Sequence, residues 1–140
     1  MLALCHGTFD LLHIGHVEMF REARSLADTV IVSLTADEYV NKGPGRPIFN
    51  EWERYHMIRA CRYVDIVDIV RAKTGESVIR EYKPDLYVKG ADYLVQDKHG
   101  SLDKERKLVE ELGGRLYIAK HAGWSSSKLI ERIRGENAGR

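Results

Sequence analysis

The chain has 140 residues, which suits a single domain, and its 22 basic and 21 acidic residues leave a net charge of +1. This balance disfavours a broad nucleic-acid-binding surface, which usually carries a clear positive excess. We expect no secretory signal and no membrane span, since no apolar run approaches the ~18–20 residues that a membrane helix needs. Cys5 and Cys61 stand far apart in apolar surroundings, which predicts buried free thiols and a cytoplasmic protein.

Apolar stretches rich in β-branched residues alternate along the chain with amphipathic stretches. The first kind, expected to form strands, covers residues 2–5, 29–34, 64–70, 85–88 and 115–119. The second kind, expected to form helices, covers residues 17–26, 52–61, 77–82, 103–112 and 128–133. This order predicts an α/β fold, a Rossmann-like doubly wound sheet of about five parallel strands with helices on both faces. We expect residues 1–134 to form this domain and residues 135–140 to form a polar tail.

Local signals mark where some of these elements begin and where a ligand would bind. Residues 42–47, Lys-Gly-Pro-Gly-Arg-Pro, are expected to form a loop, because glycine and proline at this density break regular structure. Asn50 is placed to cap the second helix, whose first turn carries Glu51 and Glu53. Ligands of open parallel sheets bind at the carboxyl ends of the strands. The segments that follow the first, second, fourth and fifth strands are therefore expected to form one site.

The segment after the first strand, residues 6–16, reads His-Gly-Thr-Phe-Asp-Leu-Leu-His-Ile-Gly-His. Gly7 and Gly15 let the backbone approach a ligand without a Cβ in the way. His13 and His16 are three residues apart, so a helical turn directs both imidazoles the same way. The amides at the start of the following helix offer a site for phosphate. These features indicate a site for nucleotide phosphates, and zinc is disfavoured because no third and fourth ligand follow at a suitable spacing.

Residues 7–16 resemble the nucleotide-binding stretch of the cytidylyltransferase-like nucleotidyltransferases, which centres on His-x-Gly-His. Residues 123–130, Gly-Trp-Ser-Ser-Ser-Lys-Leu-Ile, resemble the Ser-Thr-Thr-x-x-Ile element of that family, with serines in place of both threonines. Arg54 falls where the family has an arginine. The resemblance implies an enzyme that joins a nucleoside triphosphate to a phosphorylated alcohol or sugar and releases pyrophosphate. It also implies Mg²⁺ carried with the triphosphate, no metal site built by the protein, and a homodimer.

Attack of a phosphate oxygen on the α-phosphorus adds negative charge to the phosphoryl oxygens, so hydrogen-bond donors and cations are the groups needed. The residues expected to act in catalysis are His13, His16, Lys42 and Ser126. Those expected to hold the nucleotide are Gly7, Thr8, Phe9, Asp10, Gly15, Lys89, Gly90, Asp92, Ser125 and Ser127. Those expected to hold the acceptor are Arg46, Arg54 and Tyr93. A structural role stays open for Asp10 as a cap of its turn, and for Arg54 as a surface residue in an ion pair.

Two substrate pairs fit the resemblance. Residues 84–93, Pro-Asp-Leu-Tyr-Val-Lys-Gly-Ala-Asp-Tyr, are similar to the adenylyltransferase domain of bacterial ADP-heptose synthases, which implies ATP and D-glycero-β-D-manno-heptose 1-phosphate. Thr8 and residues 62–65 are closer to CTP-dependent enzymes that act on glycerol 3-phosphate or on choline or ethanolamine phosphate. Residues 89–93 lie where the acceptor and the base of the nucleotide would be recognised, and this position favours ATP and the heptose 1-phosphate. A non-catalytic nucleotide sensor is the third alternative, and the intact histidine pair argues against it.

Some ADP-heptose synthases carry a kinase domain fused to the adenylyltransferase domain. This sequence shows no such domain, so we expect any kinase step to belong to a separate protein. The expected partners are therefore small molecules, a nucleoside triphosphate and a phosphorylated sugar or polyol, with neither nucleic acid nor membrane among them.

Overall fold

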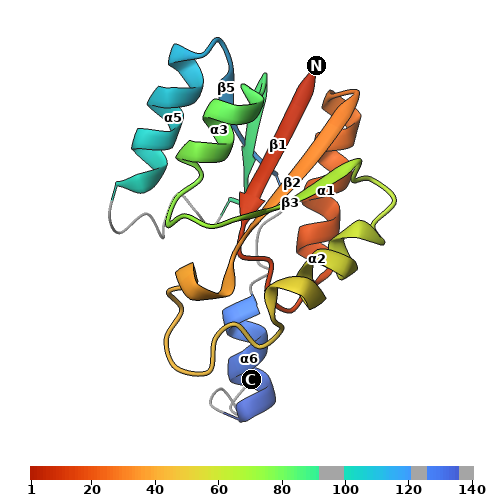
Figure 1. Cartoon of the computed structure of the whole chain (residues 1–140). Coiled ribbons are helices and arrows are strands. Elements are labelled where there is room, and N and C mark those ends of the chain that lie inside the picture. Colours follow the sequence, from red (N-terminus) through yellow and green to blue (C-terminus); the bar gives the residue numbers. More distant parts are fainter. Residues whose placement is uncertain (92–99, 121–125, 136–140) are drawn as a thin grey trace.

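The computed structural model describes residues 1–91, 100–120 and 126–135 (Figure 1). Within these residues, five strands pair in the order β3-β2-β1-β4-β5, and every pair is parallel. The strands are β1 (Leu2–Gly7), β2 (Thr29–Thr35), β3 (Ile66–Val70), β4 (Leu86–Lys89) and β5 (Arg115–Ile118). The predicted Rossmann-like sheet is confirmed. The strand order reverses beside β1, which places a ligand crevice at the carboxyl ends of the central strands.

Helices cover both faces of this sheet, as the alternating sequence pattern predicts. They are α1 (Ile14–Leu26), the 3₁₀ turn η1 (Asp37–Tyr39), α2 (Glu51–Arg59), α3 (Glu76–Tyr82), α5 (Ser101–Glu111) and α6 (Ser126–Arg134). In Figure 1, α1 and α2 lie against one face, α3 and α5 lie against the other, and α6 lies beyond the carboxyl ends of the strands. Across the described ranges, no helix has both the length and the apolar character needed to span a membrane.

The side chains of β1 alternate between two apolar cores. Ala3 and Cys5 pack with residues of α1 and α2, whereas Leu4 packs with residues of α3 and α5. The neighbouring strand β2 is buried along nearly its whole length, as expected for a strand covered on both faces. Cys5 is buried as predicted, and burial raises the pKa of its thiol to about 12. Cys61 is only half-buried, which corrects the expectation for the second free thiol.

Two helix starts show how local sequence positions the site. Asn50 caps α2 as predicted, because its side chain accepts a hydrogen bond from the Glu53 amide and the Glu53 carboxylate accepts one from the Asn50 amide. Helix α1 begins at Ile14, three residues before the predicted start, because His13 occupies the capping position. The histidine pair therefore lies at the first turn of α1 and not in the loop before it.

Candidate active site

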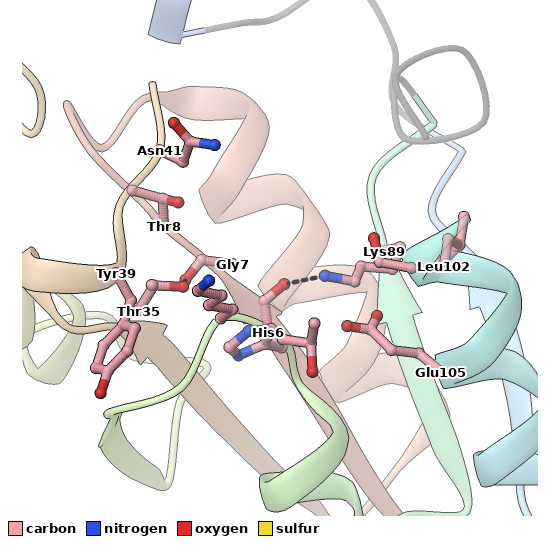
Figure 2. Close-up of a pocket in the computed structure, with 12 residues that line it drawn as sticks. His6, Gly7, Thr8, Thr35, Tyr39, Asn41, Lys89, Leu102 and Glu105 are labelled. Carbon is pink, nitrogen blue, oxygen red and sulfur yellow. Dashed lines mark hydrogen bonds between the residues drawn. The ribbon is translucent and has the colours of Figure 1, made fainter. Parts of the chain in front are cut away.

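A cavity of about 150 Å³ opens at the carboxyl ends of the central strands. Its lining residues are His6, Gly7, Thr8, Thr35, Tyr39, Asn41, Lys73, Thr74, Lys89, Ser101, Leu102 and Glu105. Figure 2 shows how these residues, contributed by β1, β2, η1, β4, α5 and the segments after β1, η1 and β3, surround the cavity. Gly7, Thr8 and Lys89 are the three lining residues that the sequence singles out for the site. The remaining lining residues carry no motif and are identified by the fold alone.

The first turn of α1 is closed by its two histidines, which form a reciprocal capping box. Nδ1 of His13 accepts a hydrogen bond of 3.1 Å from the Gly15 amide, and Nδ1 of His16 accepts one of 3.2 Å from the His13 amide. The two rings stack with their centroids 3.8 Å apart and their planes 19° from parallel. Both imidazoles are thus held in one orientation by the helix start itself.

The same capping bonds set the tautomer of both rings. A ring nitrogen that accepts an N–H bond carries no proton, so the neutral rings of His13 and His16 hold their protons on Nε2. Burial lowers the pKa of His16 to about 3, with the nearby His13 acting in the same direction and the Asp10 charge acting against both. His16 is therefore neutral at pH 7 and has an N–H donor at Nε2. Such donors suit the charge that develops on phosphoryl oxygens during nucleotidyl transfer.

The turn between β1 and α1 is tightly packed beneath these rings. A Cβ on Gly7 would lie only 3.2 Å from the Phe9 ring. Phe9 and Leu11 adopt left-handed φ angles of 55° and 49°, which non-glycine residues seldom occupy. The Phe9 ring is buried and meets the His16 ring edge-on with centroids 5.4 Å apart. The ring of Phe9 therefore supports His16, and the expected contact of Phe9 with the nucleotide stays a prediction.

Asp10 joins this turn to the loop before α2. Its buried carboxylate accepts hydrogen bonds from the Ile48 amide at 2.7 Å, the Phe49 amide at 3.0 Å and the Arg46 side chain at 3.0 Å. It also accepts one from the Leu11 amide, as the capping role predicts. Burial acts to raise the pKa of Asp10, but these bonds outweigh it and hold the pKa below its usual value. Asp10 and Arg46 thus hold the protein chain together here, and the ligand contacts expected of them stay predictions.

Arg54 is the largest fully buried side chain of the described residues. Its guanidinium donates to the Thr8 carbonyl at 2.8 Å, the Thr35 carbonyl at 2.7 Å and the Phe49 carbonyl at 3.0 Å. It also forms an ion pair of 2.7 Å with Asp37 in η1. Arg54 is therefore not a surface residue, although it does form an ion pair, and its expected contact with the acceptor stays a prediction. Arg54 fixes the ends of β1 and β2, the two strands that frame the cavity.

Helix α6 carries Ser126 and Ser127 and lies against the turn between β1 and α1. The Ser126 hydroxyl donates to the Asp10 carbonyl and lies 3.3 Å from the Leu11 carbonyl, so it fastens α6 to the turn. Ser127, next in the helix, is exposed. The convergence of residues 7–16 with the last helix, expected from the sheet topology, is therefore seen in the structure.

Lys89 ends β4 with its ammonium turned toward β1. The side chain is buried, and Nζ donates a hydrogen bond of 2.7 Å to the His6 carbonyl (Figure 2). Glu105 of α5 is also buried and accepts hydrogen bonds from the Gly75 amide at 2.9 Å and the Tyr87 hydroxyl at 2.8 Å. The cavity thus has a cationic and an anionic group in its wall. Strand alternation along β1 is the signal that could have placed His6 on the α3 and α5 side.

The other expected site residues differ in their placement. Lys42 is exposed on the loop before α2 and does not line the cavity. Gly90 follows β4 directly and is half-buried. Asp92, Tyr93 and Ser125 lie outside the described residues. In the part of the chain that the structure describes, no three His, Cys, Asp or Glu side chains are grouped to hold a metal ion.

The buried imidazoles predict a loss of stability in mild acid. Burial is the main cause that lowers the pKa of His6 and of His16 from 6.5 to about 3. Between these values the unfolded chain binds protons that the folded chain does not, so the stability present above pH 6.5 falls as the pH falls. We expect each histidine to cost about 1.5 kcal/mol of unfolding free energy between pH 6.5 and pH 5. Urea unfolding at both pH values measures this loss.

Two variants separate the contributions of these histidines. His6→Gln and His16→Asn each remove one buried imidazole, so each is expected to remove about half of the loss between pH 6.5 and pH 5. A free energy of unfolding that is equal at the two pH values in the unmodified protein would contradict the prediction.

The sequence of the chain is similar to a known protein family and to curated bacterial proteins. A family model described as cytidylyltransferase-like matches residues 4–132. The chain is 38% identical over 136 residues to the bifunctional protein HldE of Desulfatibacillum aliphaticivorans, an alignment that covers 95% of this chain and 27% of that protein. It is 39% identical over 131 residues to the bifunctional protein HldE of Citrifermentans bemidjiense, covering 91% and 26%. The chain therefore spans about a quarter of the length of these curated relatives.

Solved structures share the fold at lower sequence identity. The lipopolysaccharide core biosynthesis protein from Thermoplasma volcanium GSS1 is similar with a TM-score of 0.69 and 23% identity, covering 89% of this chain and 98% of that chain. Pantoate-beta-alanine ligase from Francisella tularensis, complexed with beta-gamma ATP and beta-alanine, is similar with a TM-score of 0.60 and 14% identity, covering 95% and 69%. At these identities the likeness supports the fold alone.

Proposed function

The chain belongs to the cytidylyltransferase-like family of nucleotidyltransferases, and we propose that it transfers the adenylyl group of ATP to D-glycero-β-D-manno-heptose 1-phosphate with release of pyrophosphate. The observation that carries the proposal is the stacked pair of His13 and His16, which has its N–H donors fixed at the start of α1. The similarity to HldE proteins and the sequence of residues 84–93 support adenylyl transfer to a sugar phosphate.

The reaction needs alignment and charge stabilisation more than acid or base chemistry. An oxygen of the acceptor's phosphate attacks the α-phosphorus of ATP and forms the new P–O bond. The bond from that phosphorus to the oxygen that bridges to the β-phosphate breaks, and pyrophosphate leaves with its electron pair. Negative charge grows on the α-phosphoryl oxygens and on the bridging oxygen. Nε2–H groups of His13 and His16 donate to these oxygens, and the positive end of the α1 dipole adds to the effect.

The acceptor is proposed to occupy the cavity on the other side of β1. Lys89 in its wall and the exposed Lys73 at its edge supply two ammonium groups, which suit an acceptor that carries a phosphate. Mg²⁺ is proposed to enter with the triphosphate and to be held mainly by its phosphate oxygens. When bound there, the ion would neutralise part of the charge on the β- and γ-phosphates.

Pyrophosphate release tests the proposal directly. The purified chain is given ATP or CTP together with either heptose 1-phosphate or glycerol 3-phosphate. We expect rapid release only with ATP and heptose 1-phosphate, because residues 84–93 resemble the adenylyltransferases. Release only with CTP and glycerol 3-phosphate, which the threonine at position 8 would suit, would replace both substrates of the proposal. A chain that binds nucleotide and releases no pyrophosphate in any combination would be a sensor in place of an enzyme.

A further inference from the structure

His6 opens the segment of residues 6–16 but is not among the residues expected to bind substrate, and its side chain forms part of the cavity wall (Figure 2). It occupies the position on β1 two residues after Leu4, so it faces α3 and α5 and not α1. The residue is only 6% exposed, and its Nδ1 lies 2.8 Å from the Ser33 hydroxyl of β2. A polar ring placed this deeply must have its hydrogen-bonding groups satisfied or directed at a ligand.

The direction of the bond to Ser33 follows from the burial of the serine. Ser33 is completely buried, and His6 Nδ1 is the one hydrogen-bond partner that its hydroxyl has within the described residues. If Nδ1 were the donor, the hydroxyl hydrogen of Ser33 would have no acceptor, which is costly in a buried site. The hydroxyl therefore donates to Nδ1, and the ring carries its proton on Nε2.

The Nε2–H group faces the cavity. No residue in the described ranges accepts a hydrogen bond from it, and no side-chain nitrogen or oxygen in those ranges is both sealed from solvent and without a partner. Nε2 is therefore reached by solvent, and the cavity is a space that His6 borders. Burial, and then the nearby Lys89 charge, lower the pKa of His6 to about 3, so the group is a neutral donor.

Another lining residue of the cavity, Glu105, offers an acceptor. The buried carboxylate of Glu105 receives one hydrogen bond on each oxygen, from Gly75 and from Tyr87, and each oxygen can accept another. A carboxylate at this depth repels a second anion, whereas a hydroxyl group can accept from His6 and donate to Glu105. The wall that contains His6 and Glu105 therefore suits the hydroxyl groups of a sugar better than its phosphate.

We propose that His6 is a specificity-determining residue whose Nε2–H donates a hydrogen bond to a hydroxyl group of the acceptor sugar. This inference rests on the proposed function, because it assigns the cavity to the acceptor of the nucleotidyl transfer. Ser33 is the positioning residue of the pair, since it selects the tautomer that exposes the donor. A phosphorylated alcohol without a matching hydroxyl would leave this donor unpaired and would bind less tightly.

Two isosteric variants test the role of His6. Asn at position 6 keeps a polar atom near the place of Nδ1, beside Ser33, and lacks a donor at the place of Nε2, whereas Gln supplies a donor there. We expect His6→Asn to raise the KM for heptose 1-phosphate about tenfold while the KM for ATP changes less than twofold. In His6→Gln, the KM for heptose 1-phosphate is expected to stay close to that of the unmodified protein. His56→Asn, on the exposed face of α2, is the matched control and should change neither constant.

Acceptor analogues separate a direct contact from a structural effect. Heptose 1-phosphate analogues that each lack one hydroxyl are assayed with the unmodified protein and with His6→Asn. One analogue should show the same KM with both proteins, because the hydrogen bond is already lost. An unchanged acceptor KM in His6→Asn, or an equal loss with every analogue, would overturn the inference and leave the proposed function standing. If pyrophosphate were released only with CTP and glycerol 3-phosphate, both the inference about His6 and the proposed function would be overturned.

Discussion

Replacing His16 with asparagine is expected to lower turnover by two or more orders of magnitude while the protein stays folded. The asparagine side chain can still accept the hydrogen bond of the His13 amide, so the first turn of α1 keeps its cap. The variant lacks the Nε2–H donor that we propose stabilises the α-phosphoryl oxygens, and the loss of one such donor commonly costs about 10²–10³ in rate. Steady-state pyrophosphate release measures the change.

The reciprocal variant, His16→Gln, provides the control for this prediction. Glutamine places an amide donor near the position of Nε2 but leaves the His13 amide without its acceptor. We expect partial activity together with a loss of about 1 kcal/mol in unfolding free energy, the usual cost of a lost helix cap. The two variants thus separate catalysis from capping. Turnover at the unmodified rate in His16→Asn would show that His16 only caps α1.

The order of the elements and the edge that holds the site follow from the sequence, because both depend on local patterns. Apolar stretches alternating with amphipathic ones predict parallel strands, and the spacing of His13 and His16 predicts that their rings share a face. The stacking of those rings agrees with this spacing. The capping box between them was not expected, because the usual signature of such a box is a serine or threonine followed by a glutamate.

The roles of the buried charged residues depend on contacts between distant segments, which no local pattern reveals. Arg54 reaches Thr8, which is 46 residues away, and Asp10 reaches Phe49, which is 39 residues away. An arginine at the start of a helix usually lies in solvent, so its complete burial is invisible before the strands are assembled. His6 and Glu105 are hidden for the same reason, since each becomes part of the site only when β1 and α5 come together.

Arg54→Met is expected to be among the most destabilising substitutions in the described residues, lowering the free energy of unfolding by about 3–5 kcal/mol. Methionine fills a similar volume but donates no hydrogen bond. The carbonyls of Thr8 and Thr35 would then lie in a buried setting without the donor that joins β1 to β2. Because Thr8 is also among the residues expected to hold the nucleotide, the KM for the nucleotide should rise as well. Urea unfolding and pyrophosphate release measure the two effects.

Arg106 of α5 provides the matched comparison for Arg54. It forms ion pairs of 2.6 Å with Asp103 and 3.1 Å with Glu110, but both carboxylates are exposed and the Arg106 side chain is 38% exposed. Water replaces such partners readily, so Arg106→Met should cost only a small part of what Arg54→Met costs and should leave the KM for the nucleotide unchanged. Arg54→Lys keeps the positive charge but lacks the planar guanidinium. Its loss of unfolding free energy is expected to lie between those of Arg54→Met and Arg106→Met. Equal losses in Arg54→Met and Arg106→Met would show that the buried guanidinium does not hold the strand ends together.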